Sequence, residues 1–246
     1  LFRSTPSMIC FRGRERVQAV FEAVSGARMM HNYFRIGGLK DDLPDNFEEM
    51  IGELMPLLQA DIEEADHLLT FNEIFLARLK GVAAISVEDA LDFGLTGPCL
   101  RACGVDYDLR KADPYSIYDR FDFNVPVGLD GDCWDRHYVR VREMYESMKI
   151  LEQALAGMPK GNVTSSLGKR LARPPEGQVY FRAENPRGEL GVYLVSDGTD
   201  KPYRLKVRPP SFCNLSAIKH MLKTTWIADT VVVLGSLDIV LGEVDR

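Results

Sequence analysis

One long apolar stripe constrains the fold of this chain more than any other feature of its sequence. Between residues 133 and 156, large apolar side chains recur at three- and four-residue spacing, at Tyr138, Val141, Met144, Tyr145, Met148, Leu151 and Leu155. This spacing puts them on one face of a helix, and the Gly157 and Pro159 that follow are typical of a helix end. The sequence therefore predicts a long helix that buries one face.

Similar but shorter patterns predict further helices on the N-terminal side. Gly26 marks the end of the first, Asp45 is a candidate cap for the second, and Ser86 is a candidate cap for a short one. The segments 31–45 and 94–132 contain many Gly, Pro and Asp residues and indicate irregular structure. The predicted helices cover residues 11–30, 46–68 and 72–80 and a short segment that follows Ser86.

The pattern changes near residue 178, where alternating apolar and polar residues predict strands. Asn185, Pro186, Arg187 and Gly188 separate the first two strands and favour a hairpin turn. Helices followed by a small antiparallel sheet make an α+β fold that is mainly α. The predicted segments are strands at 178–183, 189–196 and 203–207, a helix at 214–223 and a short buried strand or turn at 230–234.

The order of these segments predicts the domain organisation. We expect a single domain over residues 1–246, with a mainly helical part at 1–160, a loop at 161–177, and a small sheet plus C-terminal segment at 178–246. A chain of 246 residues is long enough to bury a sizeable core. The chain begins Leu-Phe-Arg without an initiator Met, a signal peptide or a transit peptide, so we expect it to be a piece of a longer protein.

Composition disfavours several classes of protein. The net charge of −6 disfavours a nucleic-acid-binding protein, because phosphate binding needs a basic surface. The apolar runs are too short to cross a bilayer, so any membrane association is expected to go through a partner. The five cysteines are odd in number and scattered, which argues against a secreted disulfide framework and favours a reducing compartment.

Few residues indicate chemistry by themselves. Cys99 and Cys103 lie one helical turn apart, which suits either a metal site or two small buried thiols, and no second cysteine pair stands at ligand spacing. His31 and His137 are candidates for a base or a ligand, although a lone histidine is more often structural. Read this way, the residues predict a helical globular protein with partners and no specific activity.

Many stretches, in order along nearly the whole chain, resemble the quinone-side, hydrogenase-derived subunit of respiratory complex I. They include Asn32-Tyr33-Phe34-Arg35-Ile36-Gly37-Gly38, Pro186-Arg187-Gly188-Glu189-Leu190-Gly191 and the terminal residues 235–246. The others lie at residues 5–6, 11–12, 42–44, 94–97, 100–105, 108–111, 141–150, 195–198 and 207–212.

The resemblance implies a fold. The family is similar to the large subunit of nickel–iron hydrogenases, so it implies a helical core of that kind with a small antiparallel sheet near the C-terminus. The family's N-terminal sheet, with a His-rich loop and a Tyr that act on the quinone head group, has no counterpart here. We therefore expect no catalytic residue in this chain and no activity from the chain alone. The stretch 160–177 is also shorter than in family members.

The resemblance also implies a function, partners and a location. The family member forms part of the cavity where quinone is reduced, beside the terminal iron–sulfur cluster of a small partner subunit, and couples electron transfer from NADH to proton pumping. The chain itself would bind no cofactor, and quinone would be the substrate. Further partners would be neighbouring peripheral-arm subunits and the quinone-channel membrane subunit. The location would be the cytoplasmic face of the bacterial inner membrane, the mitochondrial matrix side or the thylakoid stromal side.

Comparison with hydrogenases gives a prediction about metal. Where hydrogenases carry Asp-Pro-Cys-x-x-Cys with two metal-binding thiolates, this chain has residues 238–243, with Val240 and Glu243 at the ligand positions. Nickel needs soft thiolate ligands, so we expect no metal here. In the complex I family this vacated space is part of the quinone pocket, which implies that Val240 and Leu241 contact the quinone. The alternative for Val240 is plain core packing.

The resemblance finally implies a set of polar residues near the cluster and the quinone. They are His31, Arg35, Asp238, Glu243 and Arg246. The family's usual histidine position is Met30 here, and some members carry histidine at both places, so the role is carried to His31. Two other functions stay open: the large subunit of a membrane-bound, energy-converting nickel–iron hydrogenase, and a non-catalytic fragment of the complex I subunit.

Overall fold

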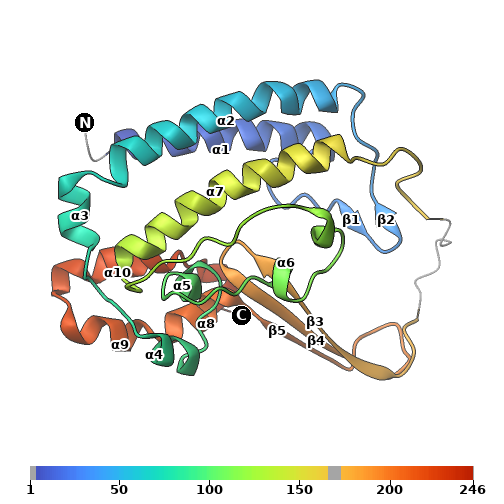
Figure 1. Ribbon diagram of the computed structural model, residues 1–246. Helices are drawn as coiled ribbons and strands as arrows, with labels where there is room; N and C mark the ends of the chain where they lie inside the picture. Colours follow the sequence, from blue (N-terminus) through green and yellow to red (C-terminus); the bar gives the residue numbers. More distant parts are fainter. Residues whose placement is uncertain (1–3, 166–172, 246) are drawn as a thin grey trace. The chain divides into compact units, whose positions relative to one another are not determined.

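The computed structural model describes residues 4–165 and 173–245 (Figure 1). It divides into two compact units. Unit 1 comprises Leu1–Phe71 and Ser147–Arg170, and unit 2 comprises Asn72–Glu146 and Leu171–Arg246. The expectation of a single domain stays a prediction, and each unit is described by itself.

Unit 1 is built on a pair of long helices, α1 (Thr5–Ser25) and α2 (Phe47–Leu69). Helix α1 begins earlier than predicted because Pro6 suits the first turn of a helix. It ends at Ser25 and not at the predicted residue 30, because Gly26 adopts a left-handed conformation (φ +76°) and its N–H donates to the Glu22 carbonyl. The expected capping by Asp45 is wrong, because Asn46 occupies the N-cap position and makes no side-chain cap.

A short antiparallel hairpin stands where the sequence predicted only a loop. Its strands are β1 (Phe34–Arg35) and β2 (Gly38–Leu39). The backbone of Gly38 lies so close to Val163 that a Cβ at this position would collide with the Val163 carbonyl. Glycine is therefore required here by the close approach of two backbones.

Unit 2 holds the remaining short helices and the sheet. The predicted helix after Ser86 is confirmed, because the Ser86 hydroxyl accepts the N–H of Asp89. The long helix predicted first, α7 (Cys133–Ala156), has the predicted bounds and continues into unit 1. The helices upstream of it are α3 (Glu73–Leu79), α4 (Val87–Asp92), α5 (Pro98–Arg101), α6 (Leu109–Ala112) and the 3₁₀ turn η1 (Tyr118–Arg120).

The sheet of unit 2 has the antiparallel order β3–β4–β5 and confirms the predicted hairpin. Its strands are β3 (Gly177–Asn185), β4 (Gly188–Ser196) and β5 (Arg204–Arg208). Asn185 pairs with Gly188, so Pro186 and Arg187 form a two-residue turn. This turn matters for the site described below.

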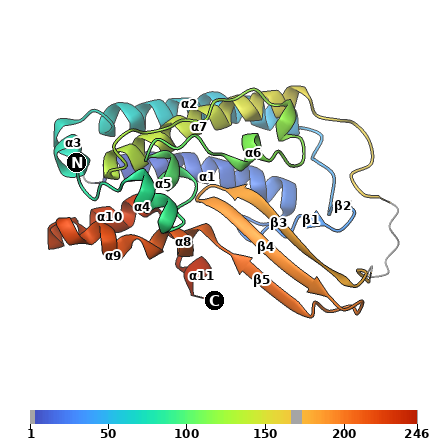
Figure 2. The same cartoon turned by 60° about the horizontal axis from the view of Figure 1, so that its bottom comes forward.

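The C-terminal part of unit 2 is a series of short helices. They are α8 (Pro210–Ser216), α9 (Ile218–Met221), η2 (Leu222–Thr224), η3 (Ile227–Asp229), α10 (Thr230–Leu237) and α11 (Leu241–Val244). The predicted single helix at 214–223 is therefore replaced by three shorter elements. Figure 2 shows α8 and α11 beside one another near the C-terminus.

The strand or turn predicted at 230–234 is wrong, because these residues begin helix α10. A short continuous apolar run does not distinguish a strand from a buried helix. The burial pattern is helical: Val233 and Leu237, four residues apart, are fully buried, whereas Val231 is 78% exposed.

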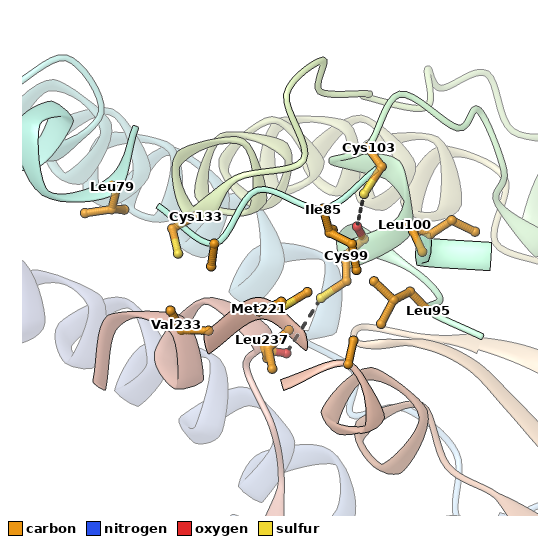
Figure 3. Close-up of a cluster of buried hydrophobic side chains, with 13 residues drawn as sticks. Leu79, Ile85, Leu95, Cys99, Leu100, Cys103, Cys133, Met221, Val233 and Leu237 are labelled. Carbon is orange, nitrogen blue, oxygen red and sulfur yellow. Dashed lines mark hydrogen bonds between the residues drawn. The ribbon is translucent and has the colours of Figure 1, made fainter. Parts of the chain in front are cut away.

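The core of unit 2 is a cluster of buried apolar side chains drawn from its helices (Figure 3). It includes Cys99, Cys103 and Cys133 as well as Val233 and Leu237. The described residues thus form a mainly helical structure with a small antiparallel sheet, as predicted. The hydrogenase-like core and the missing N-terminal sheet stay predictions.

Candidate functional site

The turn between α10 and α11, together with the start of α11, carries four of the seven predicted site residues. We call residues 238–240 the C-terminal turn. Asp238 ends α10 in a left-handed conformation (φ +51°), which is uncommon for a residue other than glycine. The strained backbone lets the chain reverse directly after the helix, so that Val240 stands at the N-cap of α11.

Ser211 holds the C-terminal turn from helix α8. Its side chain is fully buried, and its hydroxyl accepts the N–H of Val240 at 3.2 Å. Its own backbone N–H donates to Glu243 Oε2 at 3.3 Å. Because this one buried residue bonds both Val240 and Glu243, it fixes the end of the C-terminal turn to the start of α11.

Arg187 holds the same turn from the hairpin between β3 and β4. Its Nε donates to the Asp238 carbonyl at 2.7 Å, and its Nη2 donates to Asp238 Oδ1 at 3.4 Å. The hairpin is itself anchored, because the fully buried Asn214 donates to the Arg187 carbonyl at 3.1 Å. A guanidinium fork is well suited to bind two oxygens of one residue.

The C-terminal turn and the first residue of α11 place one apolar side chain inward and two outward. Ile239 packs against the core cluster of unit 2. Val240 is 36% exposed and Leu241 is 70% exposed. The result is an apolar surface bordered by Asp238, Glu243 and the guanidinium of Arg187.

His31 lies in unit 1, in the loop that follows α1. Its ring packs on Phe21 with centroids 4.5 Å apart, and its Nδ1 lies 3.0 Å from the Ala27 carbonyl. A carbonyl only accepts, so Nδ1 carries the proton and Nε2 is the basic nitrogen. Met30 and Asn32 on either side have positive φ angles of 58° and 44°, so this segment is held in an unusual conformation.

His31 borders a hollow of about 410 Å³ in unit 1. Its other lining residues include the apolar Val17, Phe21 and Met30, the cationic Arg14 and Arg28, and the polar Gln18. Arg28 is paired with Glu15 and Glu22. Arg35, in β1, is exposed on the same unit.

The structure brings together part of the predicted site. Asp238, Val240, Leu241 and Glu243 lie in one short segment of unit 2, whereas His31 and Arg35 lie in unit 1. Arg246 lies outside the described residues. The association of the two groups of residues stays a prediction.

Sequence reasoning did not single out Arg187 or Ser211. Both lie inside stretches that carry the family resemblance, at 186–191 and 207–212. That position is the only signal in the sequence, because Arg187 and Asp238 are 51 residues apart and no periodicity relates them.

The cysteines of the core are structural. Cys99 and Cys103 are buried, and their thiols lie against the carbonyls of Leu237 and Cys99 (Figure 3). Burial raises the pKa of Cys103 to about 11, which disfavours a thiolate. The interpretation of these residues as buried core thiols is confirmed.

The donor atoms at the C-terminal turn do not fit nickel. Val240 has no donor atom, and the Glu243 carboxylate accepts the Ser211 N–H. Nickel sites of the hydrogenase kind use soft thiolates. Over residues 4–165 and 173–245, no three His, Cys, Asp or Glu side chains gather closely enough to hold a metal ion.

An ionic cluster lies in unit 2 around Arg101, whose side chain is 2% exposed. Arg101 Nε donates to Glu143 at 2.7 Å, and Nη1 donates to Glu184 at 3.0 Å. Burial raises the pKa values of Glu143 and Glu184 in spite of Arg101. Burial acts in the same direction on Asp108, but Arg110 and Arg101 hold the pKa of this carboxyl below its usual value.

Comparison with known proteins identifies the family of the chain. The model of a family described as "Respiratory-chain NADH dehydrogenase, 49 Kd subunit" matches residues 2–173 and 165–246. The chain belongs to this family. The two matched segments meet in the stretch that was expected to be shorter than in other members.

Curated relatives match almost the whole chain. A protein from Dehalococcoides mccartyi, named as a subunit of NADH-quinone oxidoreductase, is 49% identical over 242 residues, which are 98% of this chain and 66% of the relative. A protein of the same name from Carboxydothermus hydrogenoformans is 49% identical over 238 residues, which are 97% of this chain and 65% of the relative. The chain thus spans about two thirds of the length of these relatives. Among the described helices, none is both long and apolar enough to cross a membrane.

Proposed function

We propose that the chain is part of a peripheral-arm subunit of a proton-translocating NADH:quinone oxidoreductase and forms one wall of its quinone-reduction cavity. The observation that carries this proposal is the exposure of Val240, in the C-terminal turn, and of Leu241, which follows it, beside a polar border. Family membership supports it, because the relatives are named for reaction with a quinone.

The chemistry of a quinone fits this surface. A quinone combines an apolar ring and tail with two carbonyl oxygens, and sites for such ligands are mainly apolar with a few placed polar groups. Val240 and Leu241 would contact the apolar part. Asp238 and Glu243 would set the local charge while the quinone gains two electrons and two protons.

The electrons would come from an iron–sulfur cluster in a small partner subunit, and the chain itself would hold no cofactor. We place His31 and Arg35 near that cluster. The basic Nε2 of His31 would take up a proton as the cluster is reduced. In that case His31→Ala alters the pH dependence of the cluster's midpoint potential, and a redox titration identical to wild type contradicts the role.

The partners and the location follow from the same proposal. The chain would contact the small iron–sulfur subunit, neighbouring peripheral-arm subunits and a membrane subunit that leads quinone to the cavity. It would lie on the cytoplasmic face of a bacterial inner membrane or on the equivalent side of an organelle membrane, and quinone reduction would drive proton pumping in the membrane arm.

The substitution Val240→Met tests whether Val240 lines the quinone-reduction cavity. It adds bulk to the apolar surface, so we expect a changed KM for quinone and a changed sensitivity to quinone-site inhibitors in the assembled complex. Val231→Met is the matched control, because it makes the same change on the exposed side of α10. Identical quinone kinetics and inhibitor titration in wild type and Val240→Met contradict the proposal.

A further inference from the structure

Arg187 is the charged side chain that joins two distant parts of unit 2 at the C-terminal turn. It reaches from the two-residue turn between β3 and β4 to Asp238, 51 residues later in the chain. Its side chain is 26% exposed, so it is neither a solvated surface arginine nor a fully buried one. An arginine in this setting loses rotamer freedom and needs a compensating interaction.

The compensating interaction is a pair of hydrogen bonds from the Arg187 guanidinium to two oxygens of Asp238. Nε binds the Asp238 carbonyl at 2.7 Å, and Nη2 binds Asp238 Oδ1 at 3.4 Å. Asp238 is also the residue with the left-handed backbone, and such a conformation persists only when the surroundings hold it. Arg187 therefore stabilises the conformation that places Val240 at the surface.

The hairpin turn that carries Arg187 is held rigidly by its neighbours. A Cβ at Gly97 would collide with the backbone of Gly188, so the hairpin turn is in close contact with the start of α5. The Glu189 N–H donates to the Thr96 hydroxyl at 2.9 Å, and Asn214 binds both the Thr96 N–H and the Arg187 carbonyl. These contacts fix the position of Arg187, and Arg187 in turn fixes the position of Asp238.

We infer that Arg187 is a positioning residue that fixes the C-terminal turn and thereby sets how tightly the turn binds quinone. This inference rests on the proposed function. Arg187 acts through Asp238 and Val240, and it takes no part in the electron or proton transfer itself. Loss of the fork releases the Asp238 carbonyl and lets the strained turn relax, which moves Val240.

The test uses the assembled membrane complex with decylubiquinone as the acceptor. Arg187→Met keeps an unbranched apolar side chain and removes all the side-chain donors. We expect about a tenfold rise in KM for decylubiquinone, which is the factor for one lost charge-assisted hydrogen bond. The kcat should change less, because the reacting groups stay in place. Arg187→Lys keeps the charge and one donor nitrogen without the fork, so its KM should lie between wild type and Arg187→Met.

Two comparisons separate positioning from general stability. Arg208→Met is the matched control: Arg208 is 38% exposed and binds Glu189 of β4 at 3.1 Å, so its loss should leave the KM unchanged. Reduction of ferricyanide by NADH, which does not use the quinone site, reports whether each variant is assembled. In a double variant, Arg187→Met and Val240→Met should be non-additive, because both act on the same turn.

The outcomes distinguish this inference from the proposed function. If Val240→Met changes the KM and Arg187→Met does not, the inference is overturned and the proposed function stands. If neither changes it, the proposed function fails as well. If Arg187→Met does not assemble, Arg187→Lys carries the test, and a wild-type KM in that variant overturns the inference.

Discussion

The two units each bury a charged side chain between elements, and they do so in opposite ways. In unit 1 the buried charge is Asp61 of α2, with a side chain that is 6% exposed between Arg12 and Arg16 of α1. Both arginines lie on one helix and stay in contact with water, with 47% and 30% of their side chains exposed. Gly13 leaves the space for this contact, because a Cβ there would lie 3.2 Å from the Asp61 carboxylate.

In unit 2 several charged side chains are buried, and one of them, Arg101, has partners from separate elements. Glu143 lies on α7, Glu184 on β3, and Asp108 at the N-cap of α6. The side chains of Glu184 and Asp108 are only 6% and 2% exposed. The comparison teaches that a shared cation can join several separate elements through buried partners, whereas the shared anion joins only two helices through arginines that water reaches.

The largest expected effect comes from removing the shared cation. Arg101→Met leaves buried carboxylates without their partner, so we expect the free energy of unfolding to fall by about 3–5 kcal/mol. Both tryptophans, Trp134 and Trp226, belong to unit 2, so fluorescence in a urea titration reports on this unit. Arg182→Met is the control, because its partner Asp113 is 63% exposed and its other partner, Glu189, keeps an ion pair with Arg208, so its cost should be below about 1 kcal/mol. Equal costs for the two variants would contradict the comparison.

Removing the shared anion should cost less. Asp61→Asn keeps the size of the side chain and loses the charge. Because water can solvate the two arginines in its place, we expect the free energy of unfolding to fall by about 1–3 kcal/mol. Hydrogen exchange of the α1 and α2 amides measures the effect in unit 1. Glu64→Gln, at a residue whose side chain is 48% exposed and binds Arg12, should change exchange by less than about 0.5 kcal/mol. Unchanged hydrogen-exchange protection in Asp61→Asn would show that Asp61 does not stabilise the pairing of α1 and α2.

The smallest effect is a difference in pH dependence within the Arg101 cluster. Glu184 has a raised pKa in the folded chain, so its contribution to stability is lost as pH rises from its ordinary value of 4.5 through the folded value. Glu184→Gln removes that loss and should therefore be more stable relative to wild type at pH 8 than at pH 5. Urea titrations at both pH values measure this.

Asp108 provides the opposite sign. Its pKa is lowered in the folded chain, so its contribution is present above pH 3.8 and is lost as pH falls through the folded value. Asp108→Asn should consequently lose stability at pH 5 and at pH 8 alike. A pH dependence of the same sign in both variants would show that the two carboxyls are not distinguished by their neighbours.

Local pattern predicted the elements well where it was strong. Helix α7 has the predicted bounds, because its apolar stripe is long and Gly157 ends it. Helix α10 was missed, because Val231, Val232, Val233 and Leu234 form a continuous run without helical periodicity. The burial of Val233 and Leu237 that makes it a helix depends on contacts with distant residues.

The site could be predicted only in part for a similar reason. The resemblance pointed to residues 238–243, which are contiguous in sequence. It gave no role to Arg187 or Ser211, because their contacts with the C-terminal turn span 51 and 29 residues and arise from the fold. A bond between distant residues leaves no spacing in the sequence by which it can be predicted.

The most direct test of the central claim is photolabelling of the assembled complex with a photoreactive quinone analogue. Trypsin releases residues 224–246 as one peptide, which contains the whole C-terminal turn. We predict that mass spectrometry finds the label on Val240 or Leu241 and that excess unlabelled quinone prevents it. Labelling that excess quinone prevents, but that is confined to other peptides or other subunits, would contradict a quinone wall at the C-terminal turn.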